Sequence, residues 1–187
     1  MDRFFNTIAP LFPRMTEKQK RGVINVTNAT RHLPLKQRAY LLATAYHETA
    51  ATMQPITEYG GKKYFDKYDV GSIARALGNT PEADGDGYFF RGRGYVQITG
   101  RANYEKAGRF LKVNLVEKPD LALDPVIAAA IMIRGSTEGW FTGKKLGQYV
   151  NNTHADYISA RRVINGLDKA KLIASYAEVF EQALEVL

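Results

Sequence analysis

The sequence predicts a mainly helical fold of the α+β class, in which one helical domain carries a small insert of loop and strand. Apolar residues recur at helical spacing through most of the chain, and a stretch rich in Gly, Asp, Asn and Pro over 78–94 interrupts them. Only one short run, 95–99, alternates like a strand. Because the 187 residues contain no repeat and no linker, we expect a single domain over 1–187.

Local capping signals predict the first two helices. The run Thr16-Glu17-Lys18-Gln19 has the form of a capping box, which indicates a helix from this point to about Arg31. A second helix is expected to begin after Pro34, since apolar residues recur there on adjacent stripes. It ends near His47 and Glu48, so these two side chains are expected at a helix terminus.

The remaining elements follow along the chain. The stretch 78–94 is expected to be a long loop, and long loops in compact domains usually have a function. Residues 95–99 are expected to form a short strand. Asp124-Pro125 is typical of a helix start, and the segment 126–133 is apolar on all sides, which predicts a buried helix. Three further helices are expected, over 102–111, 156–164 and 168–186.

Composition excludes several classes of protein. The chain has no cysteine, so neither a disulfide framework nor a thiolate metal site is expected. No apolar run approaches the roughly 20 residues of a membrane-spanning helix, so the protein is not expected to be membrane-integral. The first ten residues contain Asp2, Arg3 and Pro10 where a signal peptide would continue its apolar segment, and no cleaved secretory signal is expected.

The net charge of +7 is concentrated near the N-terminus. Seven basic residues lie between positions 14 and 38, against Glu17 alone. Such a surface would attract a polyanion such as nucleic acid, an anionic membrane or a bacterial wall polymer, although a solvated pair of helices explains the pattern equally well. The seven are Arg14, Lys18, Lys20, Arg21, Arg31, Lys36 and Arg38.

Two carboxylates are candidates for acid–base chemistry. Glu48 shares a helical stripe with apolar residues, and a partly buried carboxylic acid suits general acid catalysis. Glu58, beside Tyr59 in the following loop, is a candidate for the second carboxylate that a glycosidase needs on the opposite side of the bond. A surface ion pair is the plain structural alternative for Glu48. Other candidates for the second role are Asp66, Asp69, Asp84 and Asp86.

Amide and hydroxyl side chains cluster between Gly92 and Tyr104. If the expected strand forms, Gln97 and Thr99 project from one face, with Asn103 one turn into the next helix. These groups suit a carbohydrate ligand, although a Gly-rich turn before a strand is the alternative. The run is not a dinucleotide fingerprint, because Gln97 stands where the third glycine would be.

Four motifs together resemble, in the same order, the pattern of glycoside hydrolase family 19, which includes chitinases and phage endolysins. They are His47-Glu48-Thr49, the run Gly92-Arg93-Gly94-x-x-Gln97-x-Thr99-x-x-x-Asn103-Tyr104, Trp140-Phe141, and Ile164-Asn165-Gly166. The resemblance spans about residues 40 to 187. It implies a lysozyme-like fold with a substrate cleft, and one catalytic glycoside hydrolase domain.

The resemblance also implies roles for individual residues. Glu48 corresponds to the general acid, Glu58 to the general base, and Thr99 to the hydroxyl that helps position the attacking water, so the reaction inverts the anomeric configuration. Gln97, Asn103 and Asn165 fall on substrate-contacting positions. The complete set of expected substrate-binding residues is His47, Tyr59, Arg93, Gln97, Asn103, Tyr104 and Asn165.

The sequence departs from the family pattern in two places. Members commonly have an Arg early in the final helix near the catalytic carboxylates, whereas Lys169, Lys171 and Leu172 occupy that region here, which leaves the charge partner of the site open. Plant members carry disulfides, and this chain has no cysteine. The compact, basic form of the chain and the absence of an expected signal peptide make it more similar to the phage lysis enzymes of the family.

The leading functional expectation is an endolysin that hydrolyses the β-1,4 bonds of peptidoglycan glycan strands. It would be a monomer made in the host cytoplasm without a signal peptide, and a separate holin would release it to the wall. No cofactor, no metal and no nucleic acid partner are expected. A chitinase is the alternative, and a non-enzymatic polyanion- or sugar-binding domain is a remote one. Metalloprotease chemistry is disfavoured, since Ala51 stands where the second His of H-E-x-x-H belongs.

Overall fold

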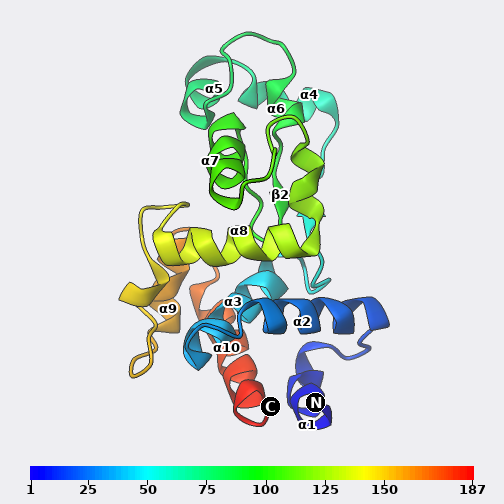
Figure 1. Cartoon of the computed structure of the whole chain (residues 1–187), viewed down its shortest axis with the longest axis vertical. Coiled ribbons are helices and arrows are strands. Elements are labelled where there is room, and N and C mark those ends of the chain that lie inside the picture. The colour runs from blue at the N-terminus through cyan, green and yellow to red at the C-terminus, as the bar shows by residue number, and fades with distance from the viewer. The chain divides into compact units, whose positions relative to one another are not determined.

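The computed structural model describes all 187 residues, which form two compact units. Unit 1 comprises Met1–Gln54 and Ala129–Leu187, and unit 2 comprises Pro55–Ala128. Ten α-helices, five short 3-10 helices and one two-stranded sheet make up the chain (Figure 1). This confirms the predicted mainly helical α+β class. A single catalytic domain over the whole chain stays a prediction.

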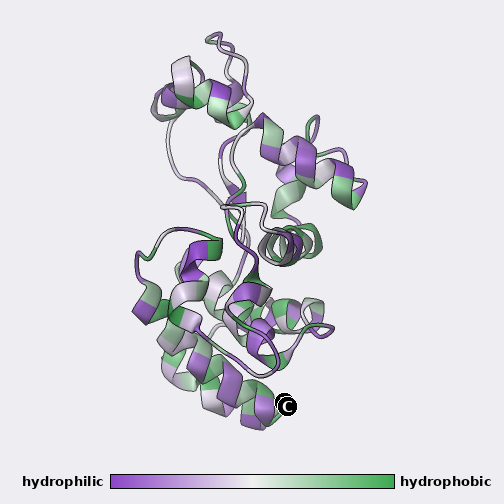
Figure 2. Cartoon of the chain, turned by 90° about the vertical axis from the view of Figure 1, so that its left-hand side faces the viewer, coloured by the Kyte–Doolittle hydropathy of each residue, from purple (hydrophilic) through white to green (hydrophobic).

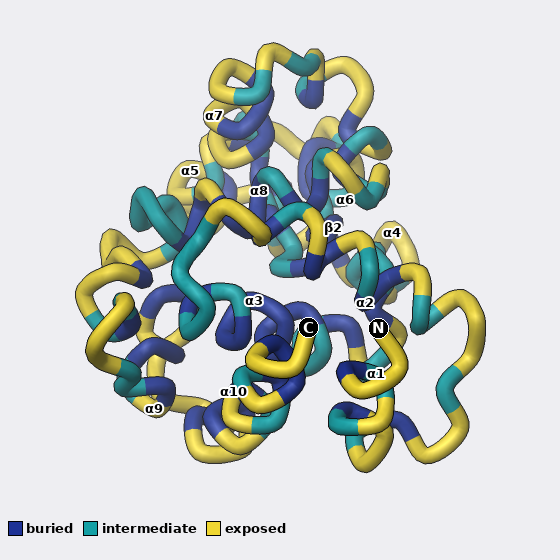
Figure 3. Tube along the Cα trace, turned by 60° about the horizontal axis from the view of Figure 1, so that its bottom comes forward, coloured by how far each residue is buried: buried dark blue, intermediate teal, exposed yellow.

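Unit 1 is built around helix α3 (Leu35–Glu48), which is buried almost continuously from Ala39 to Ala45 (Figure 3). Helices α2 (Glu17–Ala29) and α10 (Ala170–Glu185) pack against it. The smaller elements of this unit are α1 (Asp2–Ile8), η1 (Ala9–Leu11), η4 (Leu146–Gln148), α9 (Tyr157–Ala160) and η5 (Arg161–Val163). Helix α8 (Pro125–Glu138) begins in unit 2 and continues into unit 1.

Local sequence signals explain where α2 begins and how α10 packs. The Thr16 hydroxyl accepts the Gln19 backbone N–H, and the Gln19 side chain accepts the Thr16 backbone N–H at 2.8 Å, so the predicted capping box forms. The C-terminal helix carries both hydrophobic and hydrophilic residues (Figure 2). Its apolar side places the rings of Tyr176 and Phe180 against Tyr46 of α3, at centroid distances of 4.8 and 6.3 Å.

The turn that follows α3 holds an unusual backbone. Ala50, Ala51 and Met53 all have positive φ angles, of 49°, 63° and 54°. Such left-handed conformations cost energy for residues with a side chain and persist only where the surroundings impose them. Helix α2 supplies that constraint: the Gln19 amide donates to the Ala51 carbonyl, and a Cβ atom at Gly22 would lie 2.0 Å from the Met53 carbonyl oxygen.

Unit 2 contains the small sheet and the shorter helices. Strand β1 (Ile56–Thr57) pairs with β2 (Arg93–Gly94) in antiparallel fashion, with Ile56 opposite Gly94. The helical elements are α4 (Lys62–Phe65), η2 (Asp66–Tyr68), α5 (Gly71–Leu77), α6 (Asp86–Phe89), α7 (Arg101–Leu111) and η3 (Pro119–Leu123). The buried ring of Phe65 contacts the rings of Tyr64 and Tyr68, at centroid distances of 5.0 and 6.1 Å.

The strand predicted over 95–99 is wrong. Residues 95–97 form a tight turn directly after β2, and the φ angle of 44° at Gln97 does not fit an extended strand. Only Ile98 pairs, by exchanging two backbone hydrogen bonds with Arg93. Two other expectations also change: the loop 78–94 contains α6 and β2, and Val126 in the segment expected to be buried is 78% exposed.

None of the helices combines the length and the apolar character that crossing a membrane would require.

Candidate active site

Glu48 is the last residue of α3, and its carboxylate is held by an arginine. Its Oε1 atom accepts a hydrogen bond from the Arg161 guanidinium at 2.5 Å. The Arg161 side chain is only 4% exposed, whereas that of Glu48 is 24% exposed. A second guanidinium nitrogen of Arg161 donates to the Asp168 carbonyl at 3.0 Å. Arg161 is therefore fixed from two sides and presents Glu48 in a defined orientation with part of its carboxyl group open to solvent.

Arg161 is the charge partner that sequence reasoning left open. The family pattern places an arginine early in the final helix, whereas the partner here lies in η5, before that helix begins. The closest sequence signal is the position of Arg161 one turn before Asn165, whose backbone N–H donates to the Arg161 carbonyl at 2.9 Å. This spacing would have been enough to propose Arg161 as a neighbour of the Asn165 motif.

The residues on either side of Glu48 support it in different ways. The Thr49 hydroxyl donates to the Ala45 carbonyl at 2.7 Å and accepts the Met53 backbone N–H at 3.0 Å, so it ends the helix and starts the strained turn. Burial lowers the pKa of His47 despite the opposing charge of Glu48, and its ring lies 6.5 Å from that of Tyr176. His47 is thus a neutral, half-buried neighbour of the carboxylate near pH 7.

Glu58 lies in unit 2, directly after strand β1. Its Oε1 atom accepts the Tyr68 hydroxyl at 3.3 Å, and its Oε2 atom accepts the Gly92 backbone N–H at 3.2 Å. The Glu58 backbone N–H donates to the Gly92 carbonyl at 2.7 Å. Both oxygen atoms thus have neutral donors, and no lysine or arginine of this unit forms an ion pair with Glu58.

Gly92 brings Glu58 and Gln97 together. A Cβ atom at position 92 would lie 3.1 Å from Oε2 of Glu58 and 3.0 Å from Oε1 of Gln97. A side chain at this position would be in tight contact with both groups, so the glycine favours their close approach to the backbone. The left-handed Gln97 residue turns the chain so that its side chain returns toward Gly92. The structure therefore gathers the expected base and one expected substrate-contacting amide around one glycine.

Thr99 and Asn103 follow the same hairpin. The Thr99 hydroxyl donates weakly to the Gln97 carbonyl at 3.4 Å, and the Asn103 amide donates to the Thr99 carbonyl at 2.7 Å. Asn103 is exposed and Thr99 is half-buried. Among the other expected contacts, Tyr59 is 98% exposed and Asn165 is also exposed, the latter in unit 1.

Arg93 and Tyr104 occupy the interior of unit 2. Arg93 is 3% exposed and donates to the Tyr104 hydroxyl at 3.0 Å and to Asp120 at 2.8 Å. The Tyr104 hydroxyl in turn donates to the Arg91 carbonyl at 2.7 Å. Burial raises the pKa of Tyr104 to about 12. These contacts brace the Gly-rich loop from within, so the two side chains support the residues that face solvent.

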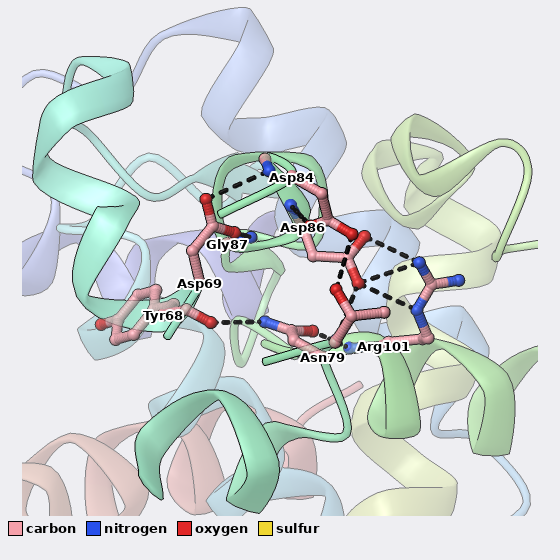
Figure 4. Close-up of polar contacts among 9 residues, drawn as sticks. Tyr68, Asp69, Asn79, Asp84, Asp86, Gly87 and Arg101 are labelled. Atoms are coloured by element: carbon pink, nitrogen blue, oxygen red, sulfur yellow. Dashed lines mark hydrogen bonds and ion pairs between the residues drawn. The ribbon is translucent and has the colours of Figure 1, made fainter. Parts of the chain in front are cut away.

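Most of the alternative carboxylates are already engaged within unit 2. Asp69 and Asp86 are buried and accept hydrogen bonds from the backbone and from Arg101 (Figure 4). Asp84 accepts the Thr80 hydroxyl at 2.6 Å. Asp66 is exposed. The structure has no group of three or more His, Asp or Glu side chains close enough together to hold a metal ion.

A helical fold with carboxylates at a helix end and beside a small sheet is typical of lysozyme-like glycoside hydrolases. The chain matches the chitinase class I family, glycoside hydrolase family 19, over residues 25–148. An acidic endochitinase of Petunia hybrida is 31% identical over 103 residues, which cover 55% of this chain and 33% of that protein. The chain belongs to glycoside hydrolase family 19.

A second relative and two solved structures agree with this family. A glycosyl hydrolase family 19 domain-containing protein of Haemophilus influenzae is 42% identical over 60 residues, 31% of this chain and 30% of that protein. The matches thus span about a third of the length of these relatives. Chitinase C from Streptomyces griseus has a TM-score of 0.67 at 18% identity, covering 96% of this chain and 75% of that one. A bacterial family 19 chitinase has a TM-score of 0.60 at 18% identity, covering 96% and 93%. At such identities the likeness shows the shared fold.

Proposed function

We propose that the protein hydrolyses the β-1,4 glycosidic bonds of bacterial peptidoglycan by an inverting mechanism, with Glu48 as general acid and Glu58 as general base. The observation that carries this proposal is that each carboxylate of the family pattern is oriented by fixed donors and belongs to a side chain that is partly exposed to solvent. Two oriented carboxylates are the apparatus that glycoside hydrolysis requires.

The acid role of Glu48 is supported by its two unequal oxygen atoms. Oε1 accepts the Arg161 hydrogen bond, so Oε2 is the atom that would carry the proton to the departing sugar oxygen. The guanidinium stays charged at every pH of interest, so it stabilises the carboxylate that remains after the proton has left. Arg161 therefore belongs to the site as a residue that orients the acid and stabilises the product form of Glu48.

The base role of Glu58 is supported by its neutral donors. Tyr68 and Gly92 each donate one hydrogen bond, which orients the carboxylate and leaves it able to accept a proton from water. In the inverting reaction this water attacks the anomeric carbon directly, on the face opposite the leaving oxygen. The Thr99 hydroxyl is the second proposed contact of the water, and Gln97 and Asn103 are proposed contacts of the sugar.

Peptidoglycan is proposed over chitin because of the charge on helix α2. Lys18 and Arg21 are exposed and Lys20 is half-buried, so the helix presents a cationic surface to solvent. Such a surface attracts an anionic wall polymer, whereas chitin is a neutral polymer of N-acetylglucosamine. Chitin remains the second candidate substrate, because the relatives and solved structures described above include chitinases by name.

A direct comparison of substrates tests the proposal. The purified protein is expected to reduce the turbidity of outer-membrane-permeabilised Gram-negative cells and to release reducing sugars from purified peptidoglycan. Under the same conditions a soluble chitin polymer should be hydrolysed much more slowly. Faster hydrolysis of the chitin polymer would replace the peptidoglycan assignment with the chitinase one, and inactivity on both polymers would refute glycosidase activity.

Charge reversal on α2 is expected to weaken binding to the wall. Replacing Lys18, Lys20 and Arg21 with Glu should reduce the fraction of protein that sediments with purified peptidoglycan sacculi at low salt. Raising the salt concentration should reduce the sedimented fraction of the native protein in the same way. The Debye length falls from about 30 Å at 0.01 M to about 10 Å at 0.1 M, so long-range attraction is screened.

A matched control separates this surface from net charge alone. Reversal of three exposed lysines elsewhere gives the same charge change without altering α2, and it should leave binding close to that of the native protein. Equal losses in both triple variants would attribute wall binding to net charge and remove the specific role of α2. The control residues are Lys118, Lys144 and Lys171.

We propose a monomer that is made in the host cytoplasm and reaches the wall through a membrane lesion opened by a separate holin-type protein. Expression in bacterial cells should then give lysis only when a membrane-permeabilising protein is co-expressed. Lysis by this chain alone would contradict the need for such a partner, and light scattering after size-exclusion chromatography checks the monomer.

A further inference from the structure

We propose that Tyr68 is a positioning residue for Glu58, and that a buried polar cluster of Asp69, Asn79, Asp86 and Arg101 fixes the place of Tyr68. This inference rests on the proposed role of Glu58 as the base. It adds to the site a residue outside the family motifs quoted above, together with the group of side chains that holds it.

The contact itself joins two side chains of unit 2. The Tyr68 hydroxyl donates to Oε1 of Glu58 at 3.3 Å, while Gly92 donates to the other oxygen at 3.2 Å. Tyr68 is the only side chain of this unit that donates to Glu58. Since the carboxylate has no arginine or lysine partner there, its orientation depends on these two neutral donors.

The phenol is suited to donate over the whole working range of pH. Partial burial and the nearby negative charge of Glu58 both raise the pKa of Tyr68 above its ordinary value. The hydroxyl therefore keeps its proton under conditions where a glycosidase works. Its ring is held against Phe65, at a centroid distance of 6.1 Å, and the Lys67 ammonium group lies 4.7 Å from the ring centroid.

The polar cluster holds the backbone of Tyr68 rather than its ring (Figure 4). The Asn79 amide donates to the Tyr68 carbonyl at 3.0 Å, and its own carbonyl oxygen accepts the Arg101 backbone N–H at 2.8 Å. The neighbouring Asp69 carboxylate accepts the backbone N–H groups of Gly85, at 3.1 Å, and Gly87, at 2.5 Å. The Asp86 carboxylate accepts hydrogen bonds from two nitrogen atoms of the Arg101 guanidinium, at 3.1 and 2.7 Å.

Close packing adds a second constraint on the same residue. A Cβ atom at Gly87 would lie 2.4 Å from the Phe65 carbonyl oxygen and 3.0 Å from the Tyr68 Cβ atom. Helix α6 therefore lies directly against η2, and only glycine at position 87 permits this approach. Asp69, Asn79 and Asp86 are all buried, so their hydrogen bonds are protected from water.

These contacts connect the loop before α6 to the proposed base. The cluster ties the segment 79–87 to η2 and to the start of α7, and η2 ends in the tyrosine that donates to Glu58. A group that accepts a proton from a bound water must keep its orientation within narrow limits. The geometry thus gives this loop a role in catalysis although none of the cluster residues donates to Glu58.

The test is the variant Tyr68→Phe, assayed on peptidoglycan over a range of pH. Loss of one hydrogen bond should lower kcat by about 2- to 12-fold with little change in KM. Because the hydroxyl favours the charged form of the base, its loss should move the acid limb of the pH profile up by about 0.4 to 1.1 pH units. Tyr64→Phe is the matched control, since Tyr64 is half-exposed, contacts the same Lys67 and donates nothing to Glu58.

Two outcomes would overturn the positioning role. One is a Tyr68→Phe variant with native kcat and a native pH profile, and the other is a Tyr64→Phe control with the same pH shift. The base assignment fails separately: a Glu58→Gln variant that keeps high activity refutes Glu58, whereas an inactive Glu58→Gln beside a native Tyr68→Phe refutes only Tyr68.

A separate variant tests the role of the polar cluster. Asn79→Ala removes the donor to the Tyr68 carbonyl, and it should shift the acid limb in the same direction as Tyr68→Phe while lowering the melting temperature. A combined variant should shift no further than Tyr68→Phe alone, because both changes act through one hydroxyl. A lower melting temperature without any pH shift would show that the cluster stabilises the fold without positioning Tyr68.

Discussion

Glu48→Gln is expected to abolish hydrolysis while leaving the fold intact. The amide carbonyl can still accept the Arg161 hydrogen bond, so the local geometry should persist, but the amide has no acidic proton for the leaving sugar oxygen. Loss of general acid catalysis alone should lower the rate by about 10² to 10⁴. Initial rates of reducing-sugar release, together with circular dichroism, measure both parts of this expectation.

Glu178→Gln provides the control for that experiment. Glu178 is exposed on helix α10 of the same unit, so the same chemical change is made away from the proposed site. It should leave the rate unchanged. If folded Glu48→Gln keeps more than about a tenth of the native rate, the acid role belongs to another residue.

Glu58→Ala is expected to be nearly inactive, and azide is expected to restore part of its turnover. Removal of the side chain leaves no group to take the proton from the attacking water, and a small anion that needs no base can occupy the vacated space. The rescued product should be a glycosyl azide of inverted configuration. Asp66→Asn is the control, because Asp66 is an exposed member of the alternative carboxylates, and it should keep native activity.

Proton NMR of the first-formed sugar gives the decisive reading for the inverting mechanism. A β-linked oligosaccharide should release the α-anomer first, because water attacks in a single displacement. That mechanism requires the carboxyl groups of the two glutamates to be about 6.5–9.5 Å apart in the substrate complex, compared with about 5–5.5 Å in a retaining enzyme. An initial β-anomer, or an Asp66→Asn variant as inactive as Glu58→Ala, would withdraw the base role from Glu58.

The sequence was most informative where the structure depends on residues that are close together in the chain. The capping box at Thr16 starts α2 as predicted, and the Asp124-Pro125 signal starts α8, with the Asp124 carboxylate accepting the Val126 N–H at 2.9 Å. In both cases the signal and the contact lie within one turn of each other. The same reason explains why the mainly helical class was predictable from periodicity alone.

The expectations that failed involve backbone angles and distant partners. Residues 95–99 alternate like a strand, but the left-handed angle of Gln97 turns them into a hairpin loop, and no periodicity reports such an angle. The pairing of Glu48 with Arg161 joins residues far apart in the chain, so it follows from tertiary packing only. For the same reason the sequence named Glu58 but could not name Tyr68 or Asn79 as its supports.

The strained turn after α3 has a consequence for how this sequence can drift over evolutionary time. The shape of this turn is maintained largely by main-chain contacts and by helix α2. Since Ala50 is exposed, its replacement by Asn or Gly, which accept left-handed backbone angles, should be tolerated. Gly22 has no such freedom, because any side chain there would collide with the Met53 carbonyl. Among descendants of this protein, the glycine on a separate helix should therefore change more rarely than the alanines that directly follow the His47-Glu48-Thr49 motif.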